Sequence, residues 1–385
     1  MKSTKDFIKY ESNGAKLLLI AGMLALVLSN SPWEIYYSSI FREAIVISFF
    51  NSTLNINILS IINECLMTIF FLVVGLEIKY ELLFGSLNST SKAILPAMGA
   101  MGGIIMPAII YYVFNYHNKL HLEGWAIPIA TDIAIALGVI TMLGSKVHSS
   151  LKAFLMALAI LDDLAAIIVI ALFYTENLSL MYFILACSCI LSLVGLNLWP
   201  VKRLLPFIAV GFCLWFCLFK MGVHPTLAGV ILAISLPVQL PGVSRKDCLS
   251  QRLKHALHPW VIFVILPIFT FANVGINVID IQMASLQWSI ILGICAGLFL
   301  GKQVGIIGFC WLSVKLGIAH LHKDVHWLEL YGVAIICGIG FTISLFIGGL
   351  AFSEVQGYLD SVKIGVFAGS LLSALVGYII LSRVK

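Results

Sequence analysis

The sequence predicts an all-α polytopic membrane protein, with one transmembrane domain covering residues 1–385. Of the 385 residues, 61% are hydrophobic and 11% are charged, and the mean hydropathy is +1.06, unlike any water-soluble domain of this length. Apolar stretches of about 20 residues, long enough to cross a bilayer as helices, recur along the whole chain. The loops between them leave no room for a separate soluble domain.

Twelve such stretches are predicted to be membrane-spanning helices. They cover residues 14–30, 59–83, 93–114, 124–143, 151–173, 178–198, 204–219, 223–239, 256–277, 288–314, 327–350 and 359–382. With twelve spans both termini share a side, and that side holds eighteen Lys and Arg against four on the other. The positive-inside rule therefore places both termini in the cytoplasm. The net charge of +5 reflects this topology, and no nucleic-acid partner is expected.

The N-terminal segment and the cysteines indicate whether the chain is processed and whether it binds a cofactor. The N-terminus, MKSTKDFIKYESNGAK, is basic and polar, and no small-residue cleavage site follows the first span, which predicts an uncleaved helix. Almost all of the nine cysteines lie in apolar spans, without a CxxC pair or a His at metal spacing. We interpret them as core residues and predict no cofactor.

Two predicted spans contain helix-weakening residues near their midpoints. The fourth has Pro128 shortly before Thr131 and Asp132, and the eleventh has Gly338 and Gly340 beside two hydroxyl residues. Each is the second member of a triplet, spans 3–5 and spans 10–12, which predicts two structural repeats with interrupted helices around a binding site. The alternative is that the two glycines only allow close helix packing.

Four ionisable side chains are predicted near mid-membrane: Asp132, Asp162, Asp163 and Lys302. Each aspartate at the bilayer centre costs roughly 2.5–3.5 kcal/mol on insertion scales, so these groups are expected to converge in the protein interior. Asp162 and Asp163 are adjacent and point about 100° apart on a helix. Their mutual repulsion favours a bound proton on at least one of them.

Lys302 can neutralise one of the three aspartates, so at least two acids need a proton or another cation. This excess predicts a carrier site at which a hard cation and protons compete for carboxylate oxygens, with Thr131 adding a hydroxyl beside Asp132. For Lys302, a static buried ion pair with one aspartate is the alternative.

Other ionisable residues are placed nearer the membrane surfaces. Glu64 lies early in the second span, and Glu77 and Glu81 lie at its cytoplasmic end, where residues can also simply reach water. His255 and His258 begin the ninth span near the cytoplasmic surface. Because histidine titrates in the physiological range, these two are candidates for sensing pH.

Eight segments carry a resemblance to a known family. They are ATDIAIALGV around Asp132, LAILDDLAAI around Asp162 and Asp163, FLGKQVGI around Lys302, FFLVVGLEIKYEL, GVHPTLAGV, RLKHALHPWV, FANVG and CGIGFTISLFI. Along the chain they occur in the order expected of the NhaA-type sodium/proton antiporters, a family of bacterial inner-membrane proteins, and over essentially the whole chain they resemble that family's signature segments.

The resemblance implies a twelve-helix fold with inverted-topology repeats, in which helices 4 and 11 are unwound and cross at mid-membrane. It implies that Asp162 and Asp163 exchange the cation and protons, and that Asp132, with Thr131 nearby, balances the dipole ends of the broken helices. Lys302 would pair with Asp162. It further implies electrogenic exchange of sodium or lithium for protons, with activation at alkaline pH.

The family's pH-responsive region maps onto Glu77, Glu81, His224, His255 and His258. Two residues depart from the usual pattern, since Tyr80 stands in place of an arginine and Lys254 in place of a glutamate, and both alter the charge at the cytoplasmic mouth. Segment 32–58 resembles the β-hairpin through which the family forms homodimers. Its alternating REAIVISFF and TLNINILS are compatible with two short periplasmic strands.

The sequence favours a secondary antiporter, which is not an enzyme, over three other classes of membrane protein. A sodium-coupled symporter for an organic solute needs a roomier cavity than a cluster of acids suggests. A retinal-type pump would use Lys302 as a Schiff-base lysine, but twelve spans rather than seven count against it. A channel is disfavoured because the sequence shows no repeated filter residues.

Overall fold

The computed structural model describes residues 2–49, 52–85, 87–175, 179–199, 201–239, 248–279, 285–321, 325–352 and 356–384. Four of the eighteen basic residues of one side lie outside these ranges, namely Arg245, Lys246, Lys323 and Lys385. The chain divides into two compact units that interleave along the sequence. Unit 1 comprises Met1–Ile20, Glu81–Ala166 and Ile276–Lys385, and unit 2 comprises Ala21–Tyr80 and Ile167–Gly275.

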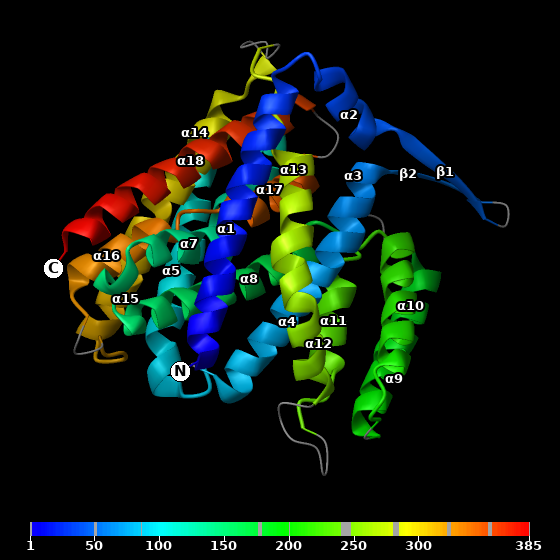
Figure 1. Ribbon diagram of the computed structural model, residues 1–385, viewed down its shortest axis with the longest axis horizontal. Helices are drawn as coiled ribbons and strands as arrows, with labels where there is room; N and C mark the ends of the chain where they lie inside the picture. The colour runs from blue at the N-terminus through cyan, green and yellow to red at the C-terminus, as the bar shows by residue number, and fades with distance from the viewer. Residues whose placement is uncertain are drawn as a thin grey trace. The chain divides into compact units, whose positions relative to one another are not determined.

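Unit 1 contains both interrupted spans and the helices packed around them (Figure 1). Besides the first part of α1 (Lys2–Ser29), its elements are α5 (Thr90–Asn115), α6 (Lys119–Leu122), η2 (Glu123–Ile129), α7 (Ile133–Met142), η3 (Gly144–Lys146), α8 (Ser149–Phe173) up to Ala166, α14 (Trp288–Ala296), η7 (Gly297–Gly301), α15 (Lys302–Lys315), α16 (Trp327–Ile336), α17 (Phe341–Ala351) and α18 (Gln356–Arg383).

Unit 2 holds the described strands and the remaining helices. Its elements include α2 (Glu34–Arg42), β1 (Ala44–Phe49), β2 (Ser52–Asn57), α3 (Ile58–Ser60), η1 (Ile61–Leu66), most of α4 (Met67–Phe84), α9 (Leu180–Leu198), α10 (Leu205–Met221), α11 (Leu227–Ser235), α12 (Leu249–Trp260), η5 (Val261–Ile265) and α13 (Leu266–Val274). Helices α9 and α10 run side by side (Figure 1).

Among the described residues, eight helices are long and apolar enough to cross a membrane, and two bent helix pairs raise the number to ten. The eight are Ser12–Ser29, Ile58–Phe84, Ala93–Asn115, Ser149–Phe173, Leu180–Leu198, Leu249–Val274, Trp288–Lys315 and Gly357–Arg383. The predicted spans 204–219 and 223–239 correspond to α10 and α11, which have 17 and 9 residues. The chain is therefore a multi-pass helical membrane protein, and the number twelve stays a prediction.

The two interrupted spans are confirmed. Lys119–Ile129 and Ile133–Met142 meet at a bend of 44°, and Trp327–Ile336 and Phe341–Ala351 meet at 45°. The first break contains Thr131 and Asp132 and comes directly after η2, which holds Pro128, and the second contains Gly338 and Gly340. Both broken spans belong to unit 1.

Helices α5 and α15 of unit 1 pack backbone to backbone where two glycines face each other. A Cβ atom added at Gly102 would lie 2.0 Å from the carbonyl oxygen of Gly305, and one added at Gly305 would lie 2.0 Å from that of Gly102. Any larger residue at either position would force the helices apart, and α15 begins at Lys302. Because Lys302 is the first residue of α15, the close contact between Gly102 and Gly305 also fixes the position of Lys302 relative to α5.

In unit 2, segment 32–58 forms a short helix followed by two paired strands. β1 and β2 are antiparallel with Ala44 opposite Asn57 and Phe49 opposite Ser52, and residues 50–51 lie outside the described residues. The hydroxyl of Tyr37 on α2 donates to the carbonyl of Phe271 at 2.5 Å. Burial raises the pKa of Tyr37 to about 12, so its hydroxyl remains a donor at physiological pH.

Candidate functional site

The first break ends at a helix cap. The 3-10 segment η2 contains Pro128 and ends at Ile129, and Ala130 follows in an extended conformation, with φ −82° and ψ 151°. Asp132 is the N-cap of α7, and its Oδ1 accepts the N–H of Ile135 at 3.1 Å. Aspartate is a preferred N-cap because its carboxylate satisfies free amides at the positive end of the helix. Asp132 therefore both terminates the break and caps α7.

The second break, residues 337–340, lies against the helix that carries Lys302. A Cβ atom at Gly338 would lie 2.4 Å from the carbonyl oxygen of Leu298, and one at Gly340 would lie 2.9 Å from the Leu298 side chain. Leu298 belongs to η7, a π-helical turn immediately before α15. The glycines thus serve both roles that the sequence allowed, because they sit in a broken helix and also permit close packing.

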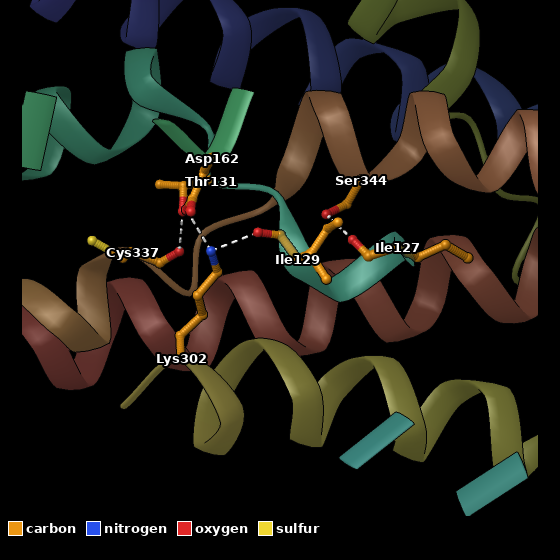
Figure 2. A network of polar contacts seen from close by, with 7 residues as sticks. All are labelled: Ile127, Ile129, Thr131, Asp162, Lys302, Cys337 and Ser344. Atoms are coloured by element: carbon orange, nitrogen blue, oxygen red, sulfur yellow. Dashed lines mark hydrogen bonds and ion pairs between the residues drawn. The ribbon is translucent and has the colours of Figure 1, made fainter. Parts of the chain in front are cut away.

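Hydrogen bonds join the two broken spans where they cross. The N–H of Asp132 donates to the carbonyl of Ile339 at 2.6 Å. The hydroxyl of Ser344 donates to the carbonyl of Ile127 at 2.7 Å (Figure 2). Thr342 donates to Asp132 Oδ2 twice, from its N–H at 3.1 Å and from its hydroxyl at 2.6 Å. A single buried carboxylate therefore caps the N-termini of both α7 and α17.

Lys302 holds the opposite kind of helix end. Its Nζ donates to Asp162 Oδ2 at 2.5 Å and to the carbonyl of Ile129, the last residue of η2, at 2.6 Å (Figure 2). The side chains of Lys302 and Asp162 are both 0% exposed. An ammonium group is favourable beside C-terminal carbonyls, which carry the negative end of the helix dipole. The expected pairing of Lys302 with Asp162 is confirmed.

Thr131 connects this ion pair to the second broken span. Its Oγ1 lies 2.7 Å from Asp162 Oδ2 and 2.8 Å from the carbonyl oxygen of Cys337, and both are placed to accept its proton (Figure 2). A hydroxyl has one proton to donate, so Thr131 can satisfy only one of these acceptors at a time. Although Asp132 is the next residue in the sequence, the carboxylate that the Thr131 hydroxyl contacts is that of Asp162.

The cluster has an excess of negative charge. Asp132, Asp162 and Asp163 are 3%, 0% and 1% exposed, and with Lys302 their ionised forms would sum to −2, three carboxylates against one ammonium. Asp162 Oδ1 is buried and accepts no hydrogen bond from any residue that the structure describes. Asp163 follows on α8 and points about 100° away. Charges buried without compensation are costly, so this arrangement favours uptake of a cation or of protons.

The donor set is made of oxygen atoms. Within the described ranges, no group of three or more His, Cys, Asp or Glu side chains is placed to hold a metal ion. The oxygens near Asp162 are instead one carboxylate, one hydroxyl and the carbonyls of Ile129 and Cys337. Carboxylates with carbonyls of unwound helices form the usual environment for a transported monovalent cation at mid-membrane.

The candidates for pH sensing lie elsewhere in the chain. Glu77 on α4 accepts from Lys254 on α12, with Nζ and Oε1 3.0 Å apart, and the ammonium lies 5.5 Å from the ring centre of Tyr80. The two residues that depart from the resembled pattern, Tyr80 and Lys254, thus lie beside each other, and Lys254 also pairs with the predicted residue Glu77. The side chains of Lys254 and Glu77 are 14% and 16% exposed, so this pair is less buried than that of Lys302.

The other four surface candidates and Glu64 lie outside the elements that carry the central cluster. His255 is exposed, while Glu81, His224 and His258 are half-buried. Glu64 lies in the π-helical turn η1 at the start of the second span and is also half-buried.

Sequence reasoning missed the main-chain partners of the site and one side chain. The carbonyls of Ile129, Cys337 and Ile339 carry no sequence signal, because any residue type supplies the same group. Ser370 on α18 accepts hydrogen bonds at the second break, although the span that contains it shows no interruption.

Comparison with known proteins adds an independent result. A family model described as Na+/H+ antiporter 1 matches residues 5–381. The antiporter NhaA of Rhodospirillum rubrum is 45% identical, covering 99% of this chain and 97% of that protein. The NhaA antiporters of Pelagibacter ubique, 45% identical over 99% and 97% of the two chains, and of Shewanella pealeana, 44% identical over 100% and 97%, are similar to the same extent. This chain belongs to the NhaA-type Na+/H+ antiporter family.

Proposed function

We propose that this protein is an electrogenic antiporter that expels sodium or lithium from the cytoplasm in exchange for periplasmic protons. The exchange occurs by alternating access at one site that both ions compete for, and it controls cytoplasmic pH and sodium. Asp162 and Asp163 bind the cation or protons in turn, assisted by Asp132 and Thr131. Relatives of 43–46% identity that carry the name Na+/H+ antiporter support the choice of ions.

One observation carries the proposal. At the crossing of two broken helices, three buried carboxylates face one buried ammonium, and the ammonium is already bound to Asp162. Asp132 is engaged by two helix N-termini, which stabilise its ionised form without a counter-ion. The acids outnumber the one ammonium, so the Asp162–Asp163 pair carries an excess of negative charge that a cation or protons can neutralise.

Electrogenic exchange follows from this charge balance. In the cation-bound state both carboxyls of the pair are ionised around one sodium ion, and Lys302 shifts from Asp162 to its second acceptor, the carbonyl of Ile129. In the proton-loaded state both carboxyls carry protons, and Lys302 keeps only the carbonyl of Ile129. The Lys302–Asp162 ion pair of the structure then corresponds to the step after Asp162 has lost its proton and before sodium binds. One cycle then moves two protons inward for each sodium ion moved outward, a net transfer of one charge.

The topology belongs to the same proposal. Twelve spans with inverted repeats 3–5 and 10–12 form a single domain in the bacterial inner membrane, with both termini cytoplasmic. The paired strands of segment 32–58 lie in the periplasm and join two copies into a homodimer. Activation at alkaline pH would involve Glu77, Glu81, His224, His255 and His258, and the Lys254–Glu77 pair supports a role for this cytoplasmic region.

The test uses everted membrane vesicles that carry the wild-type chain and a preset proton gradient. Adding sodium or lithium, without any organic solute, should collapse the gradient at alkaline pH and have little effect at acid pH, while potassium should have no effect. The same vesicles without the protein provide the background. A gradient that sodium leaves intact at every pH, or collapses only with an added solute, would overturn the proposal and favour a symporter.

A further inference from the structure

The N-terminus of α17 needs a cap that its own sequence cannot supply. Gly340 occupies the N-cap position and offers no side chain to the free amides of the first turn. A Cβ atom there would lie 2.2 Å from Ser344 Oγ and 2.9 Å from Leu298 Cδ2, so serine, threonine or aspartate would not fit without displacement. Free amides buried without an acceptor are destabilising, and another element must therefore supply the acceptor.

Two side chains from outside α17 accept these amides. Ser370 Oγ on α18 accepts the N–H of Gly340 at 3.2 Å and that of Phe341 at 3.3 Å. Asp132 Oδ2 accepts the next N–H, that of Thr342. The first turn of α17 is therefore held between a hydroxyl from α18 and a carboxylate from the other broken span. Ser370 is 7% exposed, so water does not compete freely for the contact.

We propose that Ser370 is a positioning residue of the cation site. Its hydroxyl holds the first turn of α17 at the place where Thr342 reaches Asp132, and so fixes the crossing at which Thr131 and Asp162 meet. Ser370 does not touch the cation or the reacting carboxyls. The inference rests on the proposed function, because it assigns to Ser370 an effect on cation binding at that site.

Ser373 provides a matched control on the same helix. It lies three residues further along α18, is 0% exposed and also faces the break, because its Oγ would lie 2.4 Å from a Cβ atom at Gly338. Its hydroxyl has no hydrogen-bond partner among the described residues. Removing that hydroxyl should therefore leave the first turn of α17 unchanged, although the substitution is chemically the same.

The experiment compares Ser370→Ala and Ser373→Ala, together with Ser370→Thr and Ser370→Val, which have the same shape and differ only in the hydroxyl. Sodium-driven exchange is measured in vesicles as a function of sodium concentration and pH. Ser370→Ala and Ser370→Val should raise the apparent KM for sodium by about threefold to tenfold, the range that loss of a helix cap allows. The maximal rate at saturating sodium should stay within about twofold, and Ser370→Thr and Ser373→Ala should match the wild type.

A second readout does not depend on transport. Amide hydrogen exchange across residues 337–345 should be faster in Ser370→Val than in Ser370→Thr and unchanged in Ser373→Ala, because the freed amides lose their acceptor. Equal KM values and equal amide exchange for the Val and Thr variants would overturn the inference while leaving the proposed function standing. A wild-type protein without sodium-driven exchange would instead overturn the proposed function.

Discussion

Two of the lysine–carboxylate pairs in the described part of the chain differ in their surroundings. Lys302 and Asp162 are completely buried in unit 1, at the crossing of the broken helices. Lys254 and Glu77, in unit 2, are 14% and 16% exposed and make one contact of 3.0 Å. Partners that can still reach water are screened and are worth about 0–1 kcal/mol, whereas breaking a fully buried pair costs about 3–5 kcal/mol. The two pairs have the same chemistry, and burial is what distinguishes the Lys302–Asp162 pair at the proposed cation site from the Lys254–Glu77 pair.

The surroundings also give each member of the buried pair a second hydrogen-bond partner. Lys302 has a second acceptor, the carbonyl of Ile129, and Asp162 has a second donor, the hydroxyl of Thr131. Each ion can thus lose the other without being left alone in a dry environment. The contact of Lys254 with the Tyr80 ring offers a cation–π interaction, but no alternative hydrogen-bond acceptor.

The largest effect is expected from neutralising the buried acids. Asp162→Asn and Asp163→Asn each remove a charge that binds the cation or a proton, so sodium-driven exchange in everted vesicles should fall to the background level. Both proteins should still insert in the membrane, because a neutral side chain costs less at that depth. Ser373→Ala, whose hydroxyl has no hydrogen-bond partner among the described residues, is the control and should keep the wild-type exchange rate. Full activity in either aspartate variant would sink the assignment.

Removal of the buried lysine should mainly affect stability. Lys302→Met leaves Asp162 buried without its ammonium, which should lower the free energy of unfolding by about 3–5 kcal/mol at alkaline pH. The loss should shrink at acid pH, because a proton can then neutralise the carboxyl, and the pH profile of exchange should shift.

The matched change in unit 2 is Lys254→Met, which should cost about 0–1 kcal/mol. Melting temperatures of the purified proteins across a pH series compare the two. Equal melting temperatures for the two variants would contradict the claim that burial separates the pairs.

The packing that positions Lys302 gives a smaller effect. Gly305→Ala places a methyl group against the Gly102 carbonyl, so it should lower the free energy of unfolding by about 1–3 kcal/mol and shift α15. Gly308→Ala, one turn further on, meets nothing within 4 Å and should stabilise α15 by roughly 0.5–1 kcal/mol. Thermal unfolding of the two variants should therefore move in opposite directions. If both moved the same way, the close contact with α5 would be disproved.

The smallest effect is expected from reversing the exposed pair. Glu77→Lys or Lys254→Glu alone creates a like-charge contact that should cost about 0.5–1 kcal/mol and shift the pH profile of exchange. The double variant restores an attractive pair and should return towards the wild type. Added salt should reduce the differences among the three variants. A double variant that behaves as the sum of the two single ones would show that the contact has no role.

Much of the fold could be read from the sequence because membranes impose simple rules. Apolar length identified ten of the spans, and Pro128, Gly338 and Gly340 marked the two breaks that the structure shows. The shorter helices α10 and α11 fall where the apolar stretches are shorter, so their membrane crossing could not be decided by length. The alternating residues of segment 32–58 correspond to two strands that pair in the structure.

The site was predicted in composition rather than in arrangement. An excess of acids over one lysine is visible in any sequence, but which aspartate receives Lys302 depends on how the two breaks cross. From residue types alone, Asp132 and Asp162 were equivalent partners. The structure separates them because the amides of α7 and α17 converge on Asp132, and main-chain amides leave no trace in a sequence. Ser370 was not predicted for the same reason, because its partners are the main-chain amides of Gly340 and Phe341.

The most direct test of the central claim is to count the protons that the purified protein releases when sodium binds. In weakly buffered detergent solution, at a pH low enough for both carboxyls of the Asp162–Asp163 pair to be protonated before sodium is added, we expect about two protons to be released for each bound sodium ion. Asp163→Asn should release fewer. Sodium binding that displaces no protons at any pH would contradict the idea that the two ions neutralise the same carboxylates.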